Sequence, residues 1–244
     1  MRETLVITGG SGFLGSYLCE KFSKEYFVIS IDLIHNSKRL NKNIKRITCD
    51  ITNEKDVIKK LSFLKKIKKI HLINNAAIDS VPLSTPKLKN RNSSMMRQFK
   101  VSLEGPRILI NVLSENMCKN KFGSIINIGS DLSVIAPNQE IYVGVYKNFT
   151  KSLDYSVIKH ALVGLTKYYA SLLAKFNVKV NMVSPAPILN KQKKKLVLNI
   201  KRQIPMGKLT EKNDVFNLIY FLISQKSNFI TGQNILIDGG RTII

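Results

Sequence analysis

A tyrosine and a lysine near the middle of the chain, Tyr155 and Lys159, have residue types and a spacing that suit acid–base chemistry. Four positions apart on a helix, their Cβ atoms lie about 5–6 Å from each other on one face. The ammonium group stabilises the phenolate and so lowers the tyrosine pKa from about 10 toward neutral pH. Such a phenol can give a proton to a carbonyl oxygen or take one from a hydroxyl group.

The spacing alone is not specific. Eight tyrosines in a chain with 39 Lys and Arg give roughly one such pair by chance. A second pair, Tyr17 and Lys21, occurs near the N-terminus, where packing or solvent contact is the expected role of the tyrosine. The interpretation of Tyr155 therefore depends on the elements that surround it.

A glycine-rich turn near the N-terminus predicts a nucleotide-binding element. The apolar run 4–8 predicts a buried strand, and a helical pattern runs on through Tyr17, Leu18 and Phe22. Glycines between the two let the backbone approach a pyrophosphate, and the helix N-terminus offers it free N–H groups. A flexible Gly/Ser turn is the alternative. The turn consists of Gly9, Gly10, Ser11, Gly12, Phe13, Leu14 and Gly15.

The next apolar run, 26–32, ends in an acid, Asp32. An acid at the tip of this strand accepts hydrogen bonds from the adenosine ribose hydroxyls and repels a 2′-phosphate, which favours NAD over NADP. Lys38 and Arg39 follow closely and could bind a 2′-phosphate, so NADP remains open.

Length and composition predict one domain, residues 1–244, in a reducing cytoplasm. No signal peptide and no membrane-spanning run is expected. The cysteines are odd in number and lack metal-ligand spacing, and the histidines are scattered, so each histidine is expected at a surface or helix position. These residues are Cys19, Cys49, Cys118, His35, His71 and His160.

The formal net charge of +23 raises the possibility of nucleic acid or an anionic membrane as a partner. The lysines are spread along the whole chain, however, and aromatic residues do not interleave with them as base stacking requires. We therefore expect no specific nucleic-acid or membrane partner, and a general attraction for anionic substrates.

Apolar strands alternate with amphipathic helices from end to end, which predicts an α/β fold. The expected architecture is a single Rossmann-type, doubly wound parallel sheet of about seven strands with helices on both faces. A helix from 155 to 176 is apolar on more than one side, which predicts a dimer or tetramer. Strands are expected at 4–8, 26–32, 44–49, 70–74, 124–130, 178–183 and 234–238. Further helices are expected at 53–64 (capped by Asn53), 95–117 and 213–224. An irregular segment is expected at 78–94 and a mobile one at 190–205.

Several motifs in this order resemble the short-chain dehydrogenase/reductase family over essentially the full length. The matching residues are Thr8 to Gly15, Asp32, Asp50, Asn74, Asn75, Ala76, Ala77, Ser130, Tyr155, Lys159, Asn181, Ser184, Pro185, Gly232, Gln233, Asp238, Gly239 and Gly240. The resemblance implies that Tyr155 is the acid/base, that Lys159 holds the nicotinamide ribose, and that Ser130 binds the substrate oxygen. Cofactor contacts are implied for Gly9, Ser11, Gly12, Phe13, Leu14, Gly15, Asp32, Asp50, Ile51, Asn75, Ala76, Ala77, Tyr155, Lys159, Pro185 and Ile188.

Three departures from the family pattern bear on activity. Ser102 stands where the family has a helix asparagine that supports a water next to the lysine, and a hydroxyl can still bind that water. Ala186 replaces the usual glycine after Pro185. The stretch between Ser130 and Tyr155 is longer than is common. It carries four residues that are expected to shape the substrate pocket, Pro137, Tyr142, Tyr146 and Phe149.

The leading hypothesis is an NAD-dependent oxidoreductase that interconverts an alcohol and a ketone. The run from Ser130 to Pro137 and the later Pro185, Ile188 and Leu189 resemble reductases of bacterial surface-sugar and flagellin modification. This narrower resemblance implies a sugar or sugar-phosphate substrate whose phosphate could meet the basic segment 191–202. Two alternatives remain. One is a non-catalytic, cofactor-binding regulator or nucleic-acid-binding protein; the other is a sugar-nucleotide epimerase or dehydratase, which the spacing of Gly9, Gly12 and Gly15 suggests.

Overall fold

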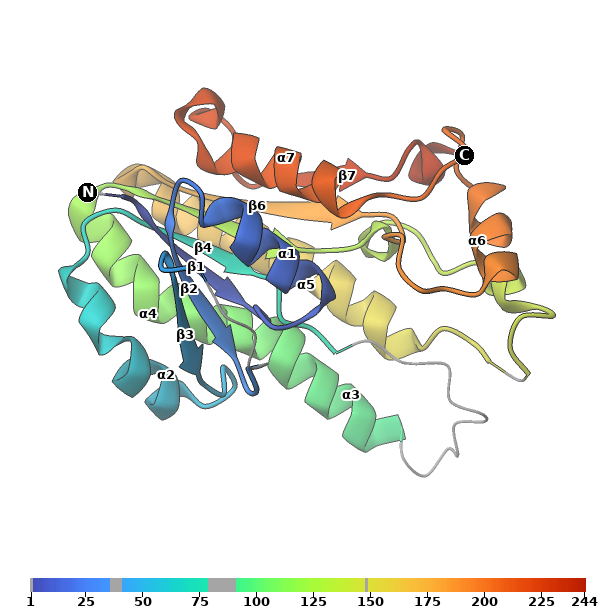
Figure 1. Cartoon of the computed structure of the whole chain (residues 1–244), viewed down its shortest axis with the longest axis horizontal. Coiled ribbons are helices and arrows are strands. Elements are labelled where there is room, and N and C mark those ends of the chain that lie inside the picture. The colour runs from blue at the N-terminus through green and yellow to red at the C-terminus, as the bar shows by residue number, and fades with distance from the viewer. Residues whose placement is uncertain (1, 36–40, 79–90, 148) are drawn as a thin grey trace.

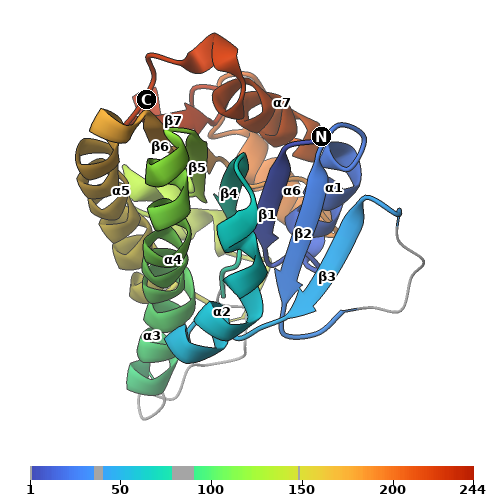
Figure 2. The ribbon, with the colours of Figure 1, turned by 90° about the vertical axis from the view of Figure 1, so that its left-hand side faces the viewer.

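Parallel strands form one sheet at the centre of the molecule (Figure 1). Their order is β3-β2-β1-β4-β5-β6-β7 (Figure 2). The computed structural model describes residues 2–35, 41–78, 91–147 and 149–244, and the strands below are those of the described residues. They are β1 Thr4–Thr8, β2 Phe27–Asp32, β3 Ile44–Thr48, β4 Ile70–Asn74, β5 Gly123–Ile128, β6 Val178–Pro185 and β7 Asn234–Ile237. Every expected strand is confirmed to within a few residues at its ends.

Helices cover both faces of the sheet (Figure 2), as the α/β prediction requires. α1 (Phe13–Phe22) and α7 (Lys212–Ile223) bury apolar side chains on one face. α2 (Glu54–Leu61), α4 (Gly105–Asn120) and α5 (Leu153–Leu173) do so on the other. Because the central strands are buried on both faces, they are nearly continuous apolar runs, and this is why the sequence predicted them well.

The helix expected at 95–117 is interrupted. α3 (Arg91–Phe99) passes into a π-helical turn, Lys100–Glu104, before α4 begins. Pro106 has no N–H group, so the Ser102 carbonyl lacks its usual α-helical donor, which accounts for the local change in hydrogen-bond register. Residues 79–90 of the segment expected to be irregular, like Lys38 and Arg39, lie outside the described residues.

The other expected helices are confirmed with small changes at their ends. Asn53 caps α2 by accepting a hydrogen bond from the Asp56 N–H at 3.2 Å. The α-helix stops at Leu61 and continues as a 3₁₀ turn, Ser62–Lys66. Within the described ranges, no helix combines the length and apolar character that crossing a bilayer requires.

The prediction that residues 190–205 are mobile is wrong. This segment contains α6 (Lys194–Lys201), which begins beside the stretch inserted between Ser130 and Tyr155. Leu196 and Ile200, one helical turn apart, are buried against Ile141 of that stretch in a small third core. The many lysines conceal this apolar stripe in the sequence, yet the stripe is sufficient to anchor the helix.

The expectation that His71 occupies a surface or helix position is also wrong. His71 lies on β4 and is buried. Its Nε2 is 3.0 Å from Oε2 of Glu3, and its Nδ1 accepts a hydrogen bond from the Ser124 N–H at 3.1 Å. A buried imidazole with both nitrogens engaged is a structural tie between neighbouring strands.

Replacing Glu3 with glutamine tests this tie. The hydrogen bond with His71 lowers the pKa of Glu3 below its ordinary value of 4.5, with Lys69 adding to the effect. A carboxylate with a depressed pKa stabilises the fold above its unfolded-state pKa, and that stability is lost as pH falls through the folded-state pKa. We expect Glu3→Gln to lower the free energy of unfolding by about 1 kcal/mol at pH 7 and by progressively less below pH 4.5.

Urea unfolding followed across this pH range is the measurement. The exposed Glu115, replaced in the same way, provides the control and should leave stability nearly unchanged at every pH. A loss in Glu3→Gln that stays constant down to about pH 3 would contradict the proposed origin in charge.

Candidate active site

The glycine-rich turn lies between β1 and α1 with its backbone closely packed. Gly9 has a φ of +65°, a conformation that residues with a Cβ rarely adopt. A Cβ on Gly15 would overlap the Gly9 carbonyl oxygen and lie 2.8 Å from Nδ2 of Asn75. That amide donates to the Thr8 carbonyl oxygen at 2.9 Å and thereby holds the turn against the end of β4. The N-terminus of α1 is thus fixed at the carboxyl edge of the sheet.

A cavity of about 680 Å³ opens at this edge, beside the point where the strand order reverses between β1 and β4. In doubly wound sheets this crevice is the usual place for a dinucleotide. We call this the nucleotide cavity; its lining includes Gly9, Gly12, Phe13, Leu14, Asp32, Asp50, Ile51, Asn75, Ala76 and Ala77. These ten were expected to contact the cofactor, and the structure brings them together.

Asp32 stands at the end of β2 with its carboxylate directed to the turn. Oδ2 accepts a hydrogen bond from the Ser11 N–H at 2.9 Å, and Oδ1 accepts one from the Leu33 N–H at 2.8 Å. The Ser11 hydroxyl is 3.1 Å from Nδ1 of His35. Ser11 and Gly15 do not line the cavity; they shape it, Ser11 by bonding Asp32 and Gly15 by allowing close packing.

A second cavity, of about 420 Å³, contains the residues expected to do the chemistry. We call it the substrate cavity. Ser130, Tyr155 and Lys159 line it together with Pro185 and Ile188. Phe13, Asn75 and Ala77 line both cavities, so the two adjoin. Its lining also includes the four residues of the inserted stretch that were expected there, Pro137, Tyr142, Tyr146 and Phe149.

Tyr155 and Lys159 lie in the first two turns of α5. The Lys159 ammonium is 5.6 Å from the centre of the Tyr155 ring and donates a 2.7 Å hydrogen bond to the Ile128 carbonyl oxygen at the end of β5. Only 4% of Lys159 is exposed to solvent. A cation so enclosed interacts strongly with its neighbours, because little water screens it.

A second cation approaches the tyrosine and was not foreseen from the sequence. The Lys151 ammonium is 4.1 Å from the centre of the Tyr155 ring, closer than that of Lys159. The Lys151 backbone is held by the Gln139 side chain, which accepts from its N–H at 2.8 Å and donates to its carbonyl oxygen at 3.3 Å. The inserted stretch therefore delivers this lysine to the face of the tyrosine.

Ser130 follows β5 and begins a 3₁₀ turn, Asp131–Ser133. Its hydroxyl donates to Oδ1 of Asp131 at 2.9 Å and accepts from the Leu132 N–H at 3.2 Å. Asp131 in turn forms a buried ion pair with Arg241, which also lines the substrate cavity. The sequence interpretation gave a role in the site to neither Asp131 nor Arg241.

Ser102, like Ser11 and Gly15, is an expected site residue that lines neither cavity. It is buried in the π-helical turn. Two further cations line the nucleotide cavity without having been foreseen, Arg97 and Lys100, from the end of α3 and the start of the π turn. No local motif marks them, since they reach the cavity only because this helix passes beside it.

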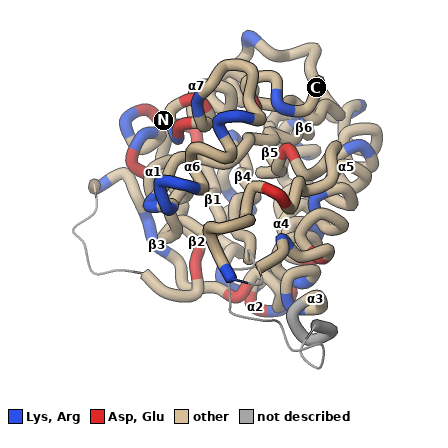
Figure 3. Tube along the Cα trace, turned by 90° about the vertical axis from the view of Figure 1, so that its right-hand side faces the viewer, with Lys and Arg blue, Asp and Glu red and all other residues tan. Residues whose placement is uncertain are grey.

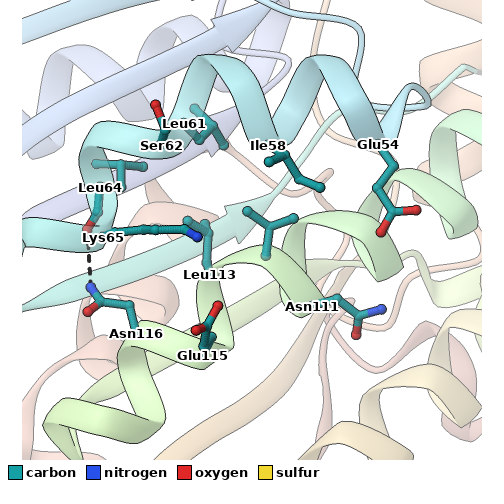
Figure 4. Close-up of a pocket in the computed structure, with 11 residues that line it drawn as sticks. Glu54, Ile58, Leu61, Ser62, Leu64, Lys65, Asn111, Leu113, Glu115 and Asn116 are labelled. Atoms are coloured by element: carbon teal, nitrogen blue, oxygen red, sulfur yellow. Dashed lines mark hydrogen bonds between the residues drawn. The ribbon is translucent and has the colours of Figure 1, made fainter.

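A third pocket, about 240 Å³ in volume, lies away from these cavities between α2 and α4 (Figure 4). Asn116 of α4 donates a hydrogen bond to the Leu64 carbonyl oxygen at 3.1 Å, which ties the two segments together. Ile58 and Leu113 form part of its apolar lining. Its lining residues include no arrangement comparable to the tyrosine, lysine and serine of the substrate cavity.

In the view of Figure 3, the Lys and Arg of the described residues occur on segments across the visible trace, with Asp and Glu between them. Over the described ranges, no group of three or more His, Cys, Asp or Glu is placed to hold a metal ion. Burial raises the pKa of the Cys19 thiol to about 11 and of Cys49 to about 12, which keeps both protonated and unreactive.

Sequence comparison relates the chain to known oxidoreductases. A family model described as enoyl-(acyl carrier protein) reductase matches residues 32–242. An NAD-dependent glycerol dehydrogenase of Listeria innocua is 28% identical over 253 residues, covering 99% of this chain and 94% of that protein. A 3-oxoacyl-[acyl-carrier-protein] reductase FabG of Buchnera aphidicola is 31% identical over 254 residues, covering 98% and 97%.

Solved structures agree with this relationship. A short-chain dehydrogenase of Leptospira borgpetersenii with bound NAD⁺ superposes with a TM-score of 0.88 at 29% identity, covering 99% of this chain and 93% of that one. ElxO with NADP bound superposes with a TM-score of 0.83 at 27% identity over the whole of both chains. With the family model spanning most of the chain, the protein belongs to the short-chain dehydrogenase/reductase family of oxidoreductases.

Proposed function

We propose that the protein is an NAD-dependent dehydrogenase/reductase that interconverts an alcohol and a ketone, with Tyr155 as its acid/base. The observation that carries the proposal is the shared lining of one cavity by Ser130, Tyr155 and Lys159. That cavity adjoins, at Phe13 and Asn75, the nucleotide cavity, which is proposed to hold the cofactor.

In this mechanism the nicotinamide cofactor takes up or supplies the hydride. Tyr155 receives the hydroxyl proton during alcohol oxidation and returns it to the carbonyl oxygen during reduction. Lys159 would favour the phenolate through its charge and would hold the cofactor ribose. Ser130 holds the substrate oxygen where negative charge develops. Ser102 would support a water near Lys159 through its hydroxyl or through the carbonyl oxygen that Pro106 leaves without an α-helical donor.

The substrate cavity favours a hydroxy or keto compound that carries a negative charge. Lys151 and Lys159 line it, the charge of Arg241 is balanced by Asp131, and no Asp or Glu belongs to its lining among the described residues. Tyr142 and Phe149, whose ring centres are 4.7 Å apart, supply flat surfaces of the kind that pack against sugar rings. A sugar phosphate satisfies both features, and we take it as the proposed substrate class.

The proposed preference for NAD can be tested at Asp32. The Asp32→Asn variant would retain a side-chain acceptor for the Ser11 N–H while losing the negative charge. Without repulsion of the 2′-phosphate, worth about 1–2 kcal/mol at short range, the ratio of NADPH to NADH dissociation constants should fall roughly ten-fold. Fluorescence titration with each cofactor measures the ratio.

Asp50→Asn is the matched control, because Asp50 lines the same cavity but engages Thr52, whose N–H and hydroxyl donate to it at 2.9 and 2.8 Å. We expect Asp50→Asn to leave the ratio of NADPH to NADH dissociation constants within about two-fold of the parent value. An unchanged ratio in Asp32→Asn would remove the basis for the NAD preference.

The function itself is tested by turnover of NADH and NADPH with a panel of ketones. Sugar ketones should be offered with and without phosphate, beside 3-oxoacyl thioesters as the neutral, extended comparison. Oxidation of either cofactor with at least one ketone supports the proposal, and a preference for the phosphorylated member supports the substrate class. Cofactor binding without turnover of any ketone or corresponding alcohol would contradict the enzymatic assignment.

Assembly into a dimer or tetramer is supported by α5. Its apolar residues Leu153, Val157, Tyr168 and Leu172 are exposed in the single chain. A second copy that covers this face would bury them, and sedimentation analysis would detect the complex. A cytoplasmic location is consistent with the three free cysteines.

A further inference from the structure

Two buried charges meet directly behind the proposed substrate-binding serine. Asp131, next to Ser130 in sequence, is 1% exposed, and Arg241 is 5% exposed. Nη1 of Arg241 donates to Oδ2 of Asp131, and Nη2 donates to Oε1 of Gln203 at 3.3 Å. Two charges taken out of water are stable only together, so each depends on the other for its place.

The turn after β7 delivers Arg241 to this position. Gly239 and Gly240 have φ values of +62° and +89°, which reverse the chain at small steric cost. Asp238 accepts hydrogen bonds from the Gly240 N–H and from the Thr242 N–H and hydroxyl. Burial acts to raise the pKa of Asp238, but the hydrogen bonds from Thr242, followed by that from Gly240, lower it below its ordinary value. Asp238 therefore remains a carboxylate. The turn is therefore rigid, and Arg241 is placed by it.

The ion pair determines what the Ser130 hydroxyl can do. As a carboxylate, Asp131 can only accept, and the Ser130 hydroxyl donates to its Oδ1. The Leu132 N–H donates both to the serine oxygen at 3.2 Å and to Oδ1 of Asp131 at 2.8 Å. These bonds hold the Ser130 oxygen at the substrate cavity. Rotation about the Cβ–Oγ bond turns the hydroxyl proton to a bound substrate oxygen and leaves the serine oxygen in place.

We propose that Asp131 and Arg241 are positioning residues that orient the Ser130 hydroxyl for the substrate oxygen. The inference rests on the proposed function, since it concerns the same site, but it assigns a role to two residues outside the tyrosine, lysine and serine. Asp131 acts through its bond to Ser130, and Arg241 acts by holding the Asp131 carboxylate in place. Through this ion pair, the C-terminal turn that carries Arg241 contacts Asp131, 110 residues earlier in the sequence, and so influences Ser130.

A double-mutant cycle tests this role. With a ketone that the parent enzyme reduces, Asp131→Asn should lower kcat/KM by roughly ten- to a hundred-fold, because a misdirected hydroxyl loses oriented contact with the reacting oxygen. In a Ser130→Ala background the same change should have less than about a two-fold effect, since no hydroxyl remains to be oriented. The NADH dissociation constant should stay the same throughout.

A paired replacement, Asp131→Leu with Arg241→Met, separates positioning from stability. Replacing a buried ion pair with apolar side chains of similar volume often restores stability. We expect this variant to melt close to the parent temperature while its kcat/KM stays as low as that of Asp131→Asn. Arg241→Lys should recover part of the activity lost in Arg241→Met, because it restores the charge.

Three results would overturn the inference. The first is that Asp131→Asn lowers kcat/KM equally in the parent and in the Ser130→Ala background. The second and third are a parent-like kcat/KM in the paired apolar variant and in Arg241→Met. A parent enzyme that is inactive on every ketone and alcohol is a different outcome, since it removes the proposed function on which the inference rests.

Discussion

Replacing Tyr155 with phenylalanine is expected to lower kcat by about a thousand-fold or more, because the substrate oxygen loses its proton partner. The ring stays in place beside Lys151 and Lys159, so the NADH dissociation constant should change by less than about two-fold. Steady-state kinetics with a ketone from the substrate panel, combined with NADH fluorescence titration, measures both quantities.

Tyr17→Phe is the matched control. Tyr17 also stands four residues before a lysine, and the Lys21 ammonium lies 5.5 Å from its ring. Its hydroxyl donates to Oδ1 of Asn213 at 3.2 Å, and it does not belong to the lining residues of either cavity. Turnover should therefore persist in this variant. Comparable activity in Tyr155→Phe and Tyr17→Phe would exclude the phenol from the mechanism.

Replacing Gly15 with alanine is expected to weaken NADH binding by about a hundred-fold or to unfold the protein. The new methyl group would overlap the Gly9 carbonyl oxygen and approach Nδ2 of Asn75 to 2.8 Å. Both neighbours are fixed, so α1 must move away from the turn that shapes the nucleotide cavity. A clash with rigid backbone costs about 1–3 kcal/mol or more, which corresponds to about ten- to a hundred-fold in binding.

Gly164→Ala is the control for this variant. Gly164 lies in α5, and a Cβ added there meets nothing within 4 Å. Alanine should leave NADH binding unchanged, because Gly164 shares its face of α5 with Leu153 and Val157 and lies away from the glycine-rich turn. If Gly15→Ala binds NADH as tightly as Gly164→Ala, the close packing of α1 on the turn is not what shapes the cofactor site.

These variants also separate the proposed function from its alternatives. A non-catalytic cofactor-binding regulator would respond to Gly15→Ala through NADH binding, whereas Tyr155→Phe would change nothing measurable. An epimerase or dehydratase would retain tightly bound cofactor without net oxidation of NADH. A nucleic-acid-binding protein would show a steep dependence of affinity on salt, and neither variant would alter it.

The strands and most helices could be predicted because the local sequence pattern indicates them. β1 and β4 are mostly apolar runs buried on both faces, and Asn53 marks the start of α2. The errors arose where a tertiary contact decides a residue's environment. α6 is held by two apolar residues within a basic segment, and His71 is buried by its place in the sheet.

The candidate site divides in the same way. Tyr155 and Lys159 are four residues apart, so helix geometry alone places them together. The glycine turn and Asp32 follow from the order of strand, turn and helix. The residues in each of these groups are close in sequence. Regular secondary structure therefore brings them together without contacts from the rest of the fold.

No local sequence pattern indicates the other contacts in the site. Arg241 reaches Asp131 across 110 residues, and Lys151 reaches Tyr155 because Gln139 holds its backbone. Arg97 enters the nucleotide cavity through the path of α3. Contacts of this kind depend on how the sheet edge, the inserted stretch and the C-terminal turn pack against one another. Many alternative pairings of 39 basic residues with 16 acidic ones are consistent with the sequence, and packing selects among them.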